Sequence, residues 1–466
     1  MGVPATTAVA WSIDGLTFNH RSPVSGGIRL GGYVVVEAPR GALLGQVLSQ
    51  QGVEEDGERL VTGAGQLLDT PAGRFGFDEV GISPAPEHLI DERLGRRGAT
   101  LELGTLRDAP GVTARLVAKG FNRHTFLCGQ SGSGKTYSLG RLLEELVLRT
   151  TLPLLVLDPN GDHVHLGRTR PGVDLAAADA YAAVANGIQV LAAEPRDGEA
   201  PLRIRMRELG AEGVAALLQL DPIADRQEYN ALLHALRDAP DEGFESVEAA
   251  TEMFRASGDE VLELIRMRTE NLAVDRMAAW AKRSARSIAE VWSQDQPRAL
   301  IADTSGFEER RERTAVAVAV LEHLWSRRKQ RRPLLLVVDE AHDVCPADPD
   351  DPQQRLAVDR FTRIAGEGRK YGIHLLLASQ RPDKLPENVL SQCDNLLLMR
   401  VNSAGDRAAL AARFGFVPPE LVELAGTFGL GESLLAGRVS PDPQLARTGA
   451  RLTPEGGADI PTDWAG

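Results

Sequence analysis

Short apolar segments, each ending in polar or turn-forming residues, recur along the chain from about residue 122 onward. The segments that have the length and continuous apolar pattern of parallel strands buried on both faces are 125–128, 154–157, 188–191, 299–302, 334–338, 374–378 and 396–399. Stretches with helical spacing separate them; the leucines at 139, 142, 143 and 146, for example, share one helical face. This alternation predicts an α/β domain with a mostly parallel sheet.

The pattern changes on either side of these segments. Residues 1–115 consist of short β-branched stretches punctuated by glycine, which predict a small β-barrel or sandwich. Residues 203–297 contain only helical patterns, and residues from about 441 are rich in Pro, Gly and Asp. We therefore predict an N-terminal β-barrel (1–115), a core in two parts (116–202 and 298–440), a helical insertion (203–297) and a C-terminal tail (441–466).

Length, net charge and cysteine content limit the kinds of protein that this chain can be. The chain has 466 residues, too many for one core, and its net charge of −13 argues against a surface that coats nucleic acid or anionic membrane. The three cysteines are far apart, and no apolar run approaches the ~20 residues needed to cross a bilayer. We expect a cytoplasmic protein without a disulfide framework and without a membrane segment of its own.

Basic residues nevertheless form local clusters. The clearest run is 327–332, and others lie at 203–207 and 310–313. Solvated helix faces and a groove that follows a phosphate backbone both fit this pattern, and the sequence does not choose between them.

One segment carries a complete phosphate-binding loop. The pattern G-x-x-x-x-G-K-T is formed by Gly129, Gln130, Ser131, Gly132, Ser133, Gly134, Lys135 and Thr136. Glycines let backbone N–H groups surround the phosphates, the lysine supplies a positive charge, and the threonine hydroxyl can bind Mg²⁺. A strand before the loop and a helix after it are the setting that the motif requires. The loop predicts ATP and Mg²⁺ as ligands.

Acidic and polar residues at the ends of other strands complete a candidate ATPase site. Asp339 and Glu340 follow an apolar strand, as in a Walker B motif, so Asp339 is expected to bind the metal and Glu340 to activate water. Gln380 follows the next strand and could sense the γ-phosphate. Asp158 either faces the nucleotide or only shapes a turn. Arg369 precedes the Gln380 strand and could reach the γ-phosphate of an adjacent subunit, with a surface ion pair as the alternative.

The motifs together resemble those of the HerA family of the HerA–FtsK superfamily. The residues that carry the resemblance, over about 1–440, are 122–124 (Asn-Arg-His), 158–161 (Asp-Pro-Asn-Gly), 339–342 (Asp-Glu-Ala-His), 368–372 (Gly-Arg-Lys-Tyr-Gly) and 379–382 (Ser-Gln-Arg-Pro). The resemblance implies a RecA-like core, a homo-hexameric ring and double-stranded DNA in a central channel. It also implies that Arg369 and Arg123 act across the subunit interface. Asn160 departs from the family, which often has histidine there.

These observations predict an ATP-hydrolysing DNA translocase or helicase. The resemblance implies a partner nuclease of the NurA type, or another effector, in DNA end processing or phage defence. Two other functions stay open: a soluble ATPase similar to those of type IV secretion and conjugation, and an ATP-gated scaffold for an effector enzyme.

Overall fold

The computed structural model describes residues 7–55, 57–69, 75–196, 198–238, 247–282 and 285–456. The chain forms two compact units, each made of several segments. The first contains 1–120, 128–138 and 394–450, and the second contains 121–127, 139–393 and 451–466. The predicted domain boundaries do not coincide with these units, and they stay a prediction.

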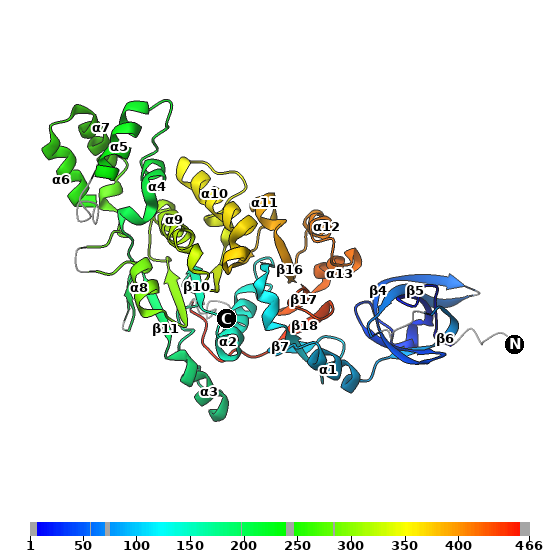
Figure 1. Cartoon of the computed structure of the whole chain (residues 1–466). Coiled ribbons are helices and arrows are strands. Elements are labelled where there is room, and N and C mark those ends of the chain that lie inside the picture. The colour runs from blue at the N-terminus through cyan, green and yellow to red at the C-terminus, as the bar shows by residue number, and fades with distance from the viewer. Residues whose placement is uncertain are drawn as a thin grey trace, which may run out of the picture. The chain divides into compact units, whose positions relative to one another are not determined.

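A closed six-stranded barrel begins the first unit and confirms the predicted N-terminal barrel (Figure 1). In barrel order, its strands are β1 (Val9–Ser12), β2 (Thr17–Pro23), β5 (Glu58–Leu67), β4 (Gly41–Glu55), β3 (Tyr33–Ala38) and β6 (Phe77–Pro84). Alternate residues of β2 point inward, and Phe18 packs there with Val34, Val36 and Val47. A Cβ at Gly65 would lie 2.3 Å from the Phe18 ring, so this position requires glycine.

An antiparallel sheet forms the rest of the first unit. Its strands are β16 (Cys393–Leu398), β17 (Glu432–Gly437), β18 (Gln444–Thr448), β7 (Leu101–Leu106) and β8 (Thr113–Leu116). Helices α1 (Glu87–Arg96), α12 (Ala404–Arg413) and α13 (Pro419–Glu423) belong to the same unit. The segment 396–399 forms a strand, as predicted, and this strand, β16, pairs with β17 in antiparallel fashion. The stretch expected to be a tail contains β18, whose Leu445 and Ala446 are buried.

The second unit contains the predicted parallel sheet. The strand order is β12 (Ala200–Pro201), β11 (Ile188–Ala192), β13 (Ala299–Asp303), β10 (Leu154–Asp158), β14 (Leu334–Val338), β15 (Ile373–Ser379) and β9 (His124–Cys128). Every residue of β9, β10, β13, β14 and β15 is buried, which explains their uninterrupted apolar sequences. The α/β class with a P-loop core is therefore confirmed.

Helices connect and cover these strands. They are α2 (Lys135–Arg149), α3 (Leu175–Ala185), α9 (Arg310–Ser326), α10 (Pro352–Glu367) and the short α11 (Glu387–Leu390). Between β12 and β13 the chain forms α4 (Gly210–Leu217), α5 (Arg226–Asp238), α6 (Val247–Ser257), α7 (Glu260–Asn271) and α8 (Ile288–Asp295). Figure 1 shows α5, α6 and α7 grouped together at one end of this unit. Among the described helices, none is long and apolar enough to cross a membrane.

Candidate active site at the carboxyl edge of the parallel sheet

The phosphate loop follows β9 directly and ends where α2 begins at Lys135. Gly132 and Gly134 have φ angles of +71° and +88°, a backbone conformation that side chains with a Cβ rarely adopt. A Cβ at Gly129 would lie 2.7 Å from the Ser133 hydroxyl, so the first glycine is needed for close packing. The N-terminus of α2 adds the partial positive charge of its free N–H groups. The loop therefore has the backbone geometry of an anion cradle.

Arg400 holds this loop from a distant part of the sequence. Its guanidinium donates a hydrogen bond of 2.8 Å to the Gly132 carbonyl, and its own carbonyl accepts one of 3.0 Å from the Gln130 N–H. The Gln130 side chain in turn accepts from the Asn402 N–H at 2.8 Å. Sequence reasoning missed Arg400 because nothing in the local pattern of residues 396–402 indicates a contact with residues 129–134.

Asp339 and Glu340 lie where β14 ends. The Asp339 N–H donates to the Leu157 carbonyl at 3.1 Å, so the ends of β10 and β14 are held together. One carboxylate oxygen of Asp339 accepts from the Glu340 N–H at 2.9 Å. Glu340 itself has φ 40° and ψ 50°, a left-handed conformation that costs a non-glycine residue about 1–3 kcal/mol. Strain of this kind at a predicted water-activating residue is typical of functional sites.

Glu340 is connected to the next strand through a histidine. Its carboxylate lies 3.4 Å from His342 Nδ1, and the same nitrogen is 3.2 Å from the Ser379 hydroxyl. Gln380 follows Ser379 directly and is partly exposed. The predicted water-activating residue and the predicted sensor are therefore linked by a short chain of polar contacts at the same edge of the sheet.

Asp158 shapes the turn after β10. Its carboxylate accepts from the N–H groups of Asn160 (3.4 Å), Asp162 (3.1 Å) and His163 (2.8 Å). Burial raises the pKa of Asp158 to about 6, against the opposing effect of His163 nearby. These hydrogen bonds are the ones expected if Asp158 shapes the turn. Contact between Asp158 and the nucleotide stays a prediction.

His163 is the second residue that sequence reasoning missed. It is fully buried, and its Nε2 lies 3.4 Å from the Asp339 carboxylate. Burial alone would lower its pKa, but the contact with the Asp339 carboxylate and the charge of Asp158 raise the pKa above its usual value. β10 and β14 pair in register, and His163 lies five residues beyond Asp158, so the fold brings it to Asp339; no local pattern in the sequence indicates this contact. His163 thus lies in contact with the carboxylate predicted to hold the metal.

The two predicted interface arginines lie at the other edge of the sheet. Arg123 directly precedes β9, and Arg369 lies in the short 3₁₀ helix Gly368–Tyr371 that leads into β15. Burial, and then the charges of Arg369 and Arg123, lower the pKa of His374 in β15 to about 4. Since the seven residues of β15 span about 20 Å, Arg369 and Gln380 are at opposite edges of the sheet.

Comparisons with known proteins agree with this architecture. The family described as Helicase HerA, central domain, matches residues 101–324. The DNA double-strand break repair helicase HerA of Pyrococcus furiosus is 24% identical over 428 residues, which are 78% of this chain and 72% of that protein. This chain is a HerA-type ATPase.

Other HerA relatives match over a shorter region. The DNA double-strand break repair helicase HerA of Sulfolobus acidocaldarius is 31% identical over 115 residues, 25% of this chain and 22% of that protein. The structure of VirB4 of Thermoanaerobacter pseudethanolicus is similar with a TM-score of 0.50 and 17% identity, covering 76% of this chain and 97% of that one. At that identity the likeness to VirB4 concerns the fold alone.

The two residues predicted to hold Mg²⁺, Thr136 and Asp339, have side chains that suit this ion. The Thr136 hydroxyl and the Asp339 carboxylate are hard oxygen donors, and Mg²⁺ in such enzymes takes only one or two protein ligands beside substrate phosphates and water. Asp339 is 2% exposed and contacts His163 and the Glu340 N–H, so its carboxylate is held in place before any cation binds. The roles of the individual site residues stay predictions.

Proposed function

We propose that this HerA-type ATPase is a motor that uses ATP hydrolysis to translocate double-stranded DNA through a homo-hexameric ring. The observation that carries the proposal is the separation of charge across the parallel sheet. Acidic and polar residues occupy the carboxyl edge, whereas Arg123 and Arg369 occupy the amino edge, about 20 Å away along β15. A guanidinium so placed can reach a γ-phosphate only if another subunit supplies that phosphate.

The proposed chemistry assigns one role to each residue. The loop from Gly129 to Thr136 binds the β- and γ-phosphates through its backbone N–H groups and Lys135. Thr136 and Asp339 would hold Mg²⁺, and the bound ion would neutralise part of the phosphate charge. Glu340 orients a water molecule and takes its proton as the water attacks the γ-phosphorus, and ADP leaves in line with that attack.

The remaining residues couple hydrolysis to movement. Arg369 of the neighbouring subunit, with Arg123 beside it, stabilises the negative charge of the transition state. Gln380 is joined to Glu340 through Ser379 and His342, which offers a route from the γ-phosphate to β15 and the residues beyond it. Loss of the γ-phosphate could therefore shift β15, and Arg369 lies just before the other end of this strand.

The substrate is proposed from the relatives. Those reported above are named as helicases of DNA double-strand break repair, and double-stranded DNA is the corresponding substrate for this chain. We further propose that a separate nuclease of the NurA type, or another effector of phage defence, acts with the ring. The clustered acids of the described site are accounted for by ATP chemistry.

One set of measurements tests the proposal. ATP turnover is measured with and without a linear DNA duplex, light scattering gives the mass of the assembly, and displacement of a third strand from a triplex reports translocation. We expect a six-subunit mass, turnover that rises with duplex DNA, and strand displacement that requires ATP. ATP turnover that does not change with DNA would favour an ATP-gated scaffold. If such a DNA-independent ATPase moves a protein, the secretion-like function is favoured. Either result overturns the proposal.

A further inference from the structure

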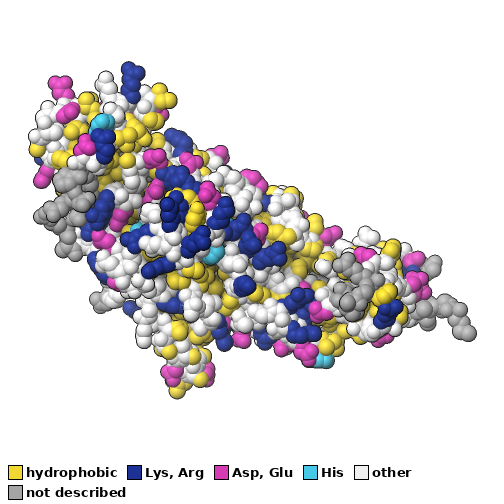
Figure 2. Space-filling model, viewed as in Figure 1, with side chains coloured by type: hydrophobic (Ala, Val, Ile, Leu, Met, Phe, Trp, Pro, Cys, Tyr) yellow, Lys and Arg dark blue, Asp and Glu magenta, His cyan; other side chains and the backbone are white. Residues whose placement is uncertain are grey.

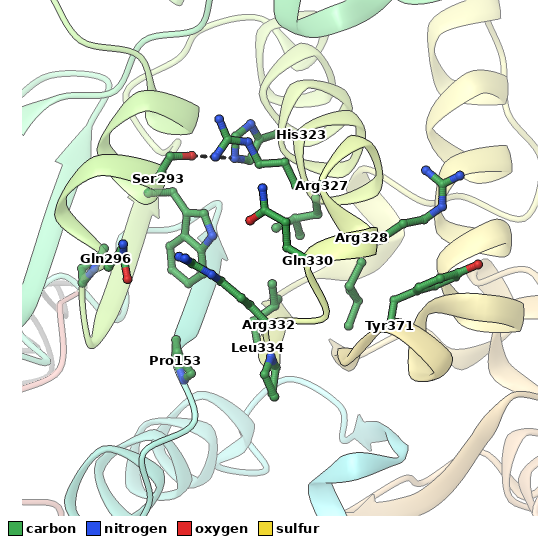
Figure 3. A pocket seen from close by; sticks show the side chains of 15 residues that line it. Pro153, Ser293, Gln296, His323, Arg327, Arg328, Gln330, Arg332, Leu334 and Tyr371 are labelled. Atoms are coloured by element: carbon green, nitrogen blue, oxygen red, sulfur yellow. Dashed lines mark hydrogen bonds between the residues drawn. The ribbon is translucent and has the colours of Figure 1, made fainter.

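A cavity at the amino edge of the parallel sheet takes no part in the proposed ATP chemistry. Its volume is about 120 Å³, and it lies where the chain enters β10 and β14 (Figure 3). The residues that characterise its lining are Trp292, Gln296, Arg327, Gln330, Arg332 and Tyr371. Three of these come from the basic run 327–332, whose purpose the sequence left open. The cavity belongs entirely to the second unit.

The charge of this cavity is uncompensated. Its lining includes three arginines and no carboxylate, although the whole chain has a net charge of −13. Arg327 and Arg332 are exposed and form no ion pair within the described chain. The nearest acids in the sequence are already engaged, since Asp295 binds Arg286 at 2.7 Å and Glu322 binds Arg360. Lys and Arg side chains also gather around α9 on the face shown in Figure 2. The cavity therefore attracts an anion.

The three arginines of the cavity differ in whether their guanidinium groups already contact a side chain of the protein. Figure 3 shows Arg332 reaching into the cavity between Gln296 and Gln330, while Arg327 lies beside His323. Arg328 turns toward Tyr371, with its guanidinium carbon 5.7 Å from that ring and 4.4 Å from the Trp325 ring. Arg328 is thus occupied by stacking, and Arg327 and Arg332 remain to bind a ligand.

The rest of the lining suits a flat aromatic ligand with hydrogen-bonding edges. Trp292 supplies an indole wall, and the amides of Gln296 and Gln330 can both donate and accept. Burial and the charge of Arg327 lower the pKa of His323 to about 4, so this imidazole is neutral at pH 7 and bonds to the Ser293 hydroxyl at 3.0 Å.

We propose that this cavity binds one unpaired nucleoside 5′-monophosphate unit, with its base beside Trp292 and its phosphate on Arg327 and Arg332. Stacking on aromatic rings with phosphate contacts from arginine is the usual way in which proteins hold unpaired bases. The unit could be a free mononucleotide or a residue of a single strand, and the chemistry of recognition is the same. The inference does not depend on DNA translocation.

This binding would be separate from the chain's own ATP chemistry. β14 begins in the cavity wall at Leu334 and reaches Asp339 only after its five residues, a rise of about 16 Å. A ligand at the amino edge therefore cannot be the nucleotide on which Asp339 and Glu340 of the same chain act.

The test uses the full chain carrying Lys135→Ala, which removes the main positive charge of the phosphate loop. Calorimetric titration is made with thymidine 5′-monophosphate and with 5′-phosphorylated (dT)₄. We expect binding that weakens roughly 5- to 100-fold with Trp292→Leu and with Arg332→Ala, and that Trp292→Phe largely preserves because it keeps an aromatic ring. Thymidine without phosphate and inorganic phosphate alone should each bind more weakly than the nucleotide.

Arg276→Ala is the matched control. The Arg276 side chain is 74% exposed and lies outside the cavity, so its loss removes the same charge without touching the site. Binding of the mononucleotide supports a free nucleotide as the source, and binding of (dT)₄ alone, with the same sensitivity to Arg332, supports a single strand. The proposal is overturned if neither ligand binds or if Arg276→Ala weakens binding as much as Arg332→Ala. It is also overturned if Arg332→Ala changes only the mass of the assembly, which would make the cavity a subunit interface.

Discussion

The two edges of the parallel sheet carry functional side chains of opposite charge and different exposure. At the carboxyl edge, Asp158, Asp339 and Glu340 are buried or nearly so, and each is fixed by contacts within its own chain. At the amino edge, Arg327 and Arg332 are exposed and free of ion pairs in the described chain, and Arg369 is partly exposed. One edge is a preorganised site for a cation and water, whereas the other presents positive charge outward.

The difference follows from the geometry of parallel strands. All carboxyl ends meet at one edge and all amino ends at the other, and five to seven residues separate them by about 16–20 Å. Because this distance exceeds a Debye length of about 8 Å, charges at the two edges hardly affect each other through solvent. A catalytic site that needs both edges must therefore combine two chains.

The largest expected effect comes from removing the arginine at the amino edge. Arg369→Ala should reduce ATP turnover by on the order of 10³-fold, because such an arginine stabilises transition-state charge. Arg363→Ala is the control, since Arg363 is exposed and its guanidinium carbon lies 5.6 Å from the Trp325 ring. Turnover is measured with saturating ATP and duplex DNA.

Mixing variants separates action in trans from action within one chain. Subunits with Arg369→Ala keep a complete phosphate loop, and subunits with Lys135→Ala keep the arginine. Mixed rings should regain part of the activity that neither variant has alone. If no mixing ratio restores turnover, Arg369 acts on its own chain and the comparison between the two edges loses its functional meaning.

At the carboxyl edge, Glu340→Gln should lower turnover by roughly 10²- to 10³-fold while ATP still binds, because the amide cannot accept the proton of the attacking water. Binding is followed with a fluorescent ATP analogue. Asp348→Asn is a suitable control, since Asp348 is exposed and has no proposed role in hydrolysis. Loss of ATP binding in the Glu340 variant would instead give this residue a role in metal binding or folding.

A smaller effect is expected from His163→Gln. Removing the imidazole that contacts Asp339 should raise the Mg²⁺ concentration for half-maximal turnover about 10- to 100-fold, as for other residues that orient metal ligands. His165→Gln controls for a substitution in the same loop at a partly exposed position. An unchanged Mg²⁺ requirement would mean that His163 only fills space.

The smallest effect concerns stability at the amino edge. The pKa of His374 is about 4 in the folded chain, against about 6.5 in an unfolded one, because of burial and the charges of Arg369 and Arg123. Its depressed pKa means that its stabilising contribution is complete above pH 6.5 and is lost as pH falls toward 4. His374→Gln should remove this contribution. The fall in unfolding free energy between pH 7 and pH 5 should then be smaller by about 1–2 kcal/mol.

Urea unfolding at pH 7 and pH 5 measures this difference. His88→Gln at an exposed position serves as the control and should leave the pH dependence unchanged. Equal pH dependence in the His374 variant and the unmodified chain would mean that folding does not lower the pKa of His374.

Much of the fold could be predicted from the sequence. The strand 334–338 has the predicted bounds, and β9, β10, β11 and β13 differ from the predicted ranges by only one residue at an end. Uninterrupted apolar runs are unambiguous when a strand is buried on both faces. β18 was missed because its apolar stretch is short and lies among Pro, Gly and Asp.

The candidate site was predicted unevenly for a physical reason. Glycine spacing and an acidic strand end are local signals, so residues 129–136 and the pair Asp339–Glu340 were found. Arg400 and His163 act through contacts with residues far away in the sequence, and no local pattern encodes such contacts.

The sequence by itself determined the phosphate loop, the parallel strands and the acidic strand ends, because each depends on the chemistry and spacing of neighbouring residues. Only the tertiary structure decided that His163 meets Asp339, that Arg400 holds the loop, and that Arg123 and Arg369 lie at the edge of the sheet opposite to Asp339. These relations depend on the order and direction of strands in the sheet, which bring distant residues together or keep them about 20 Å apart.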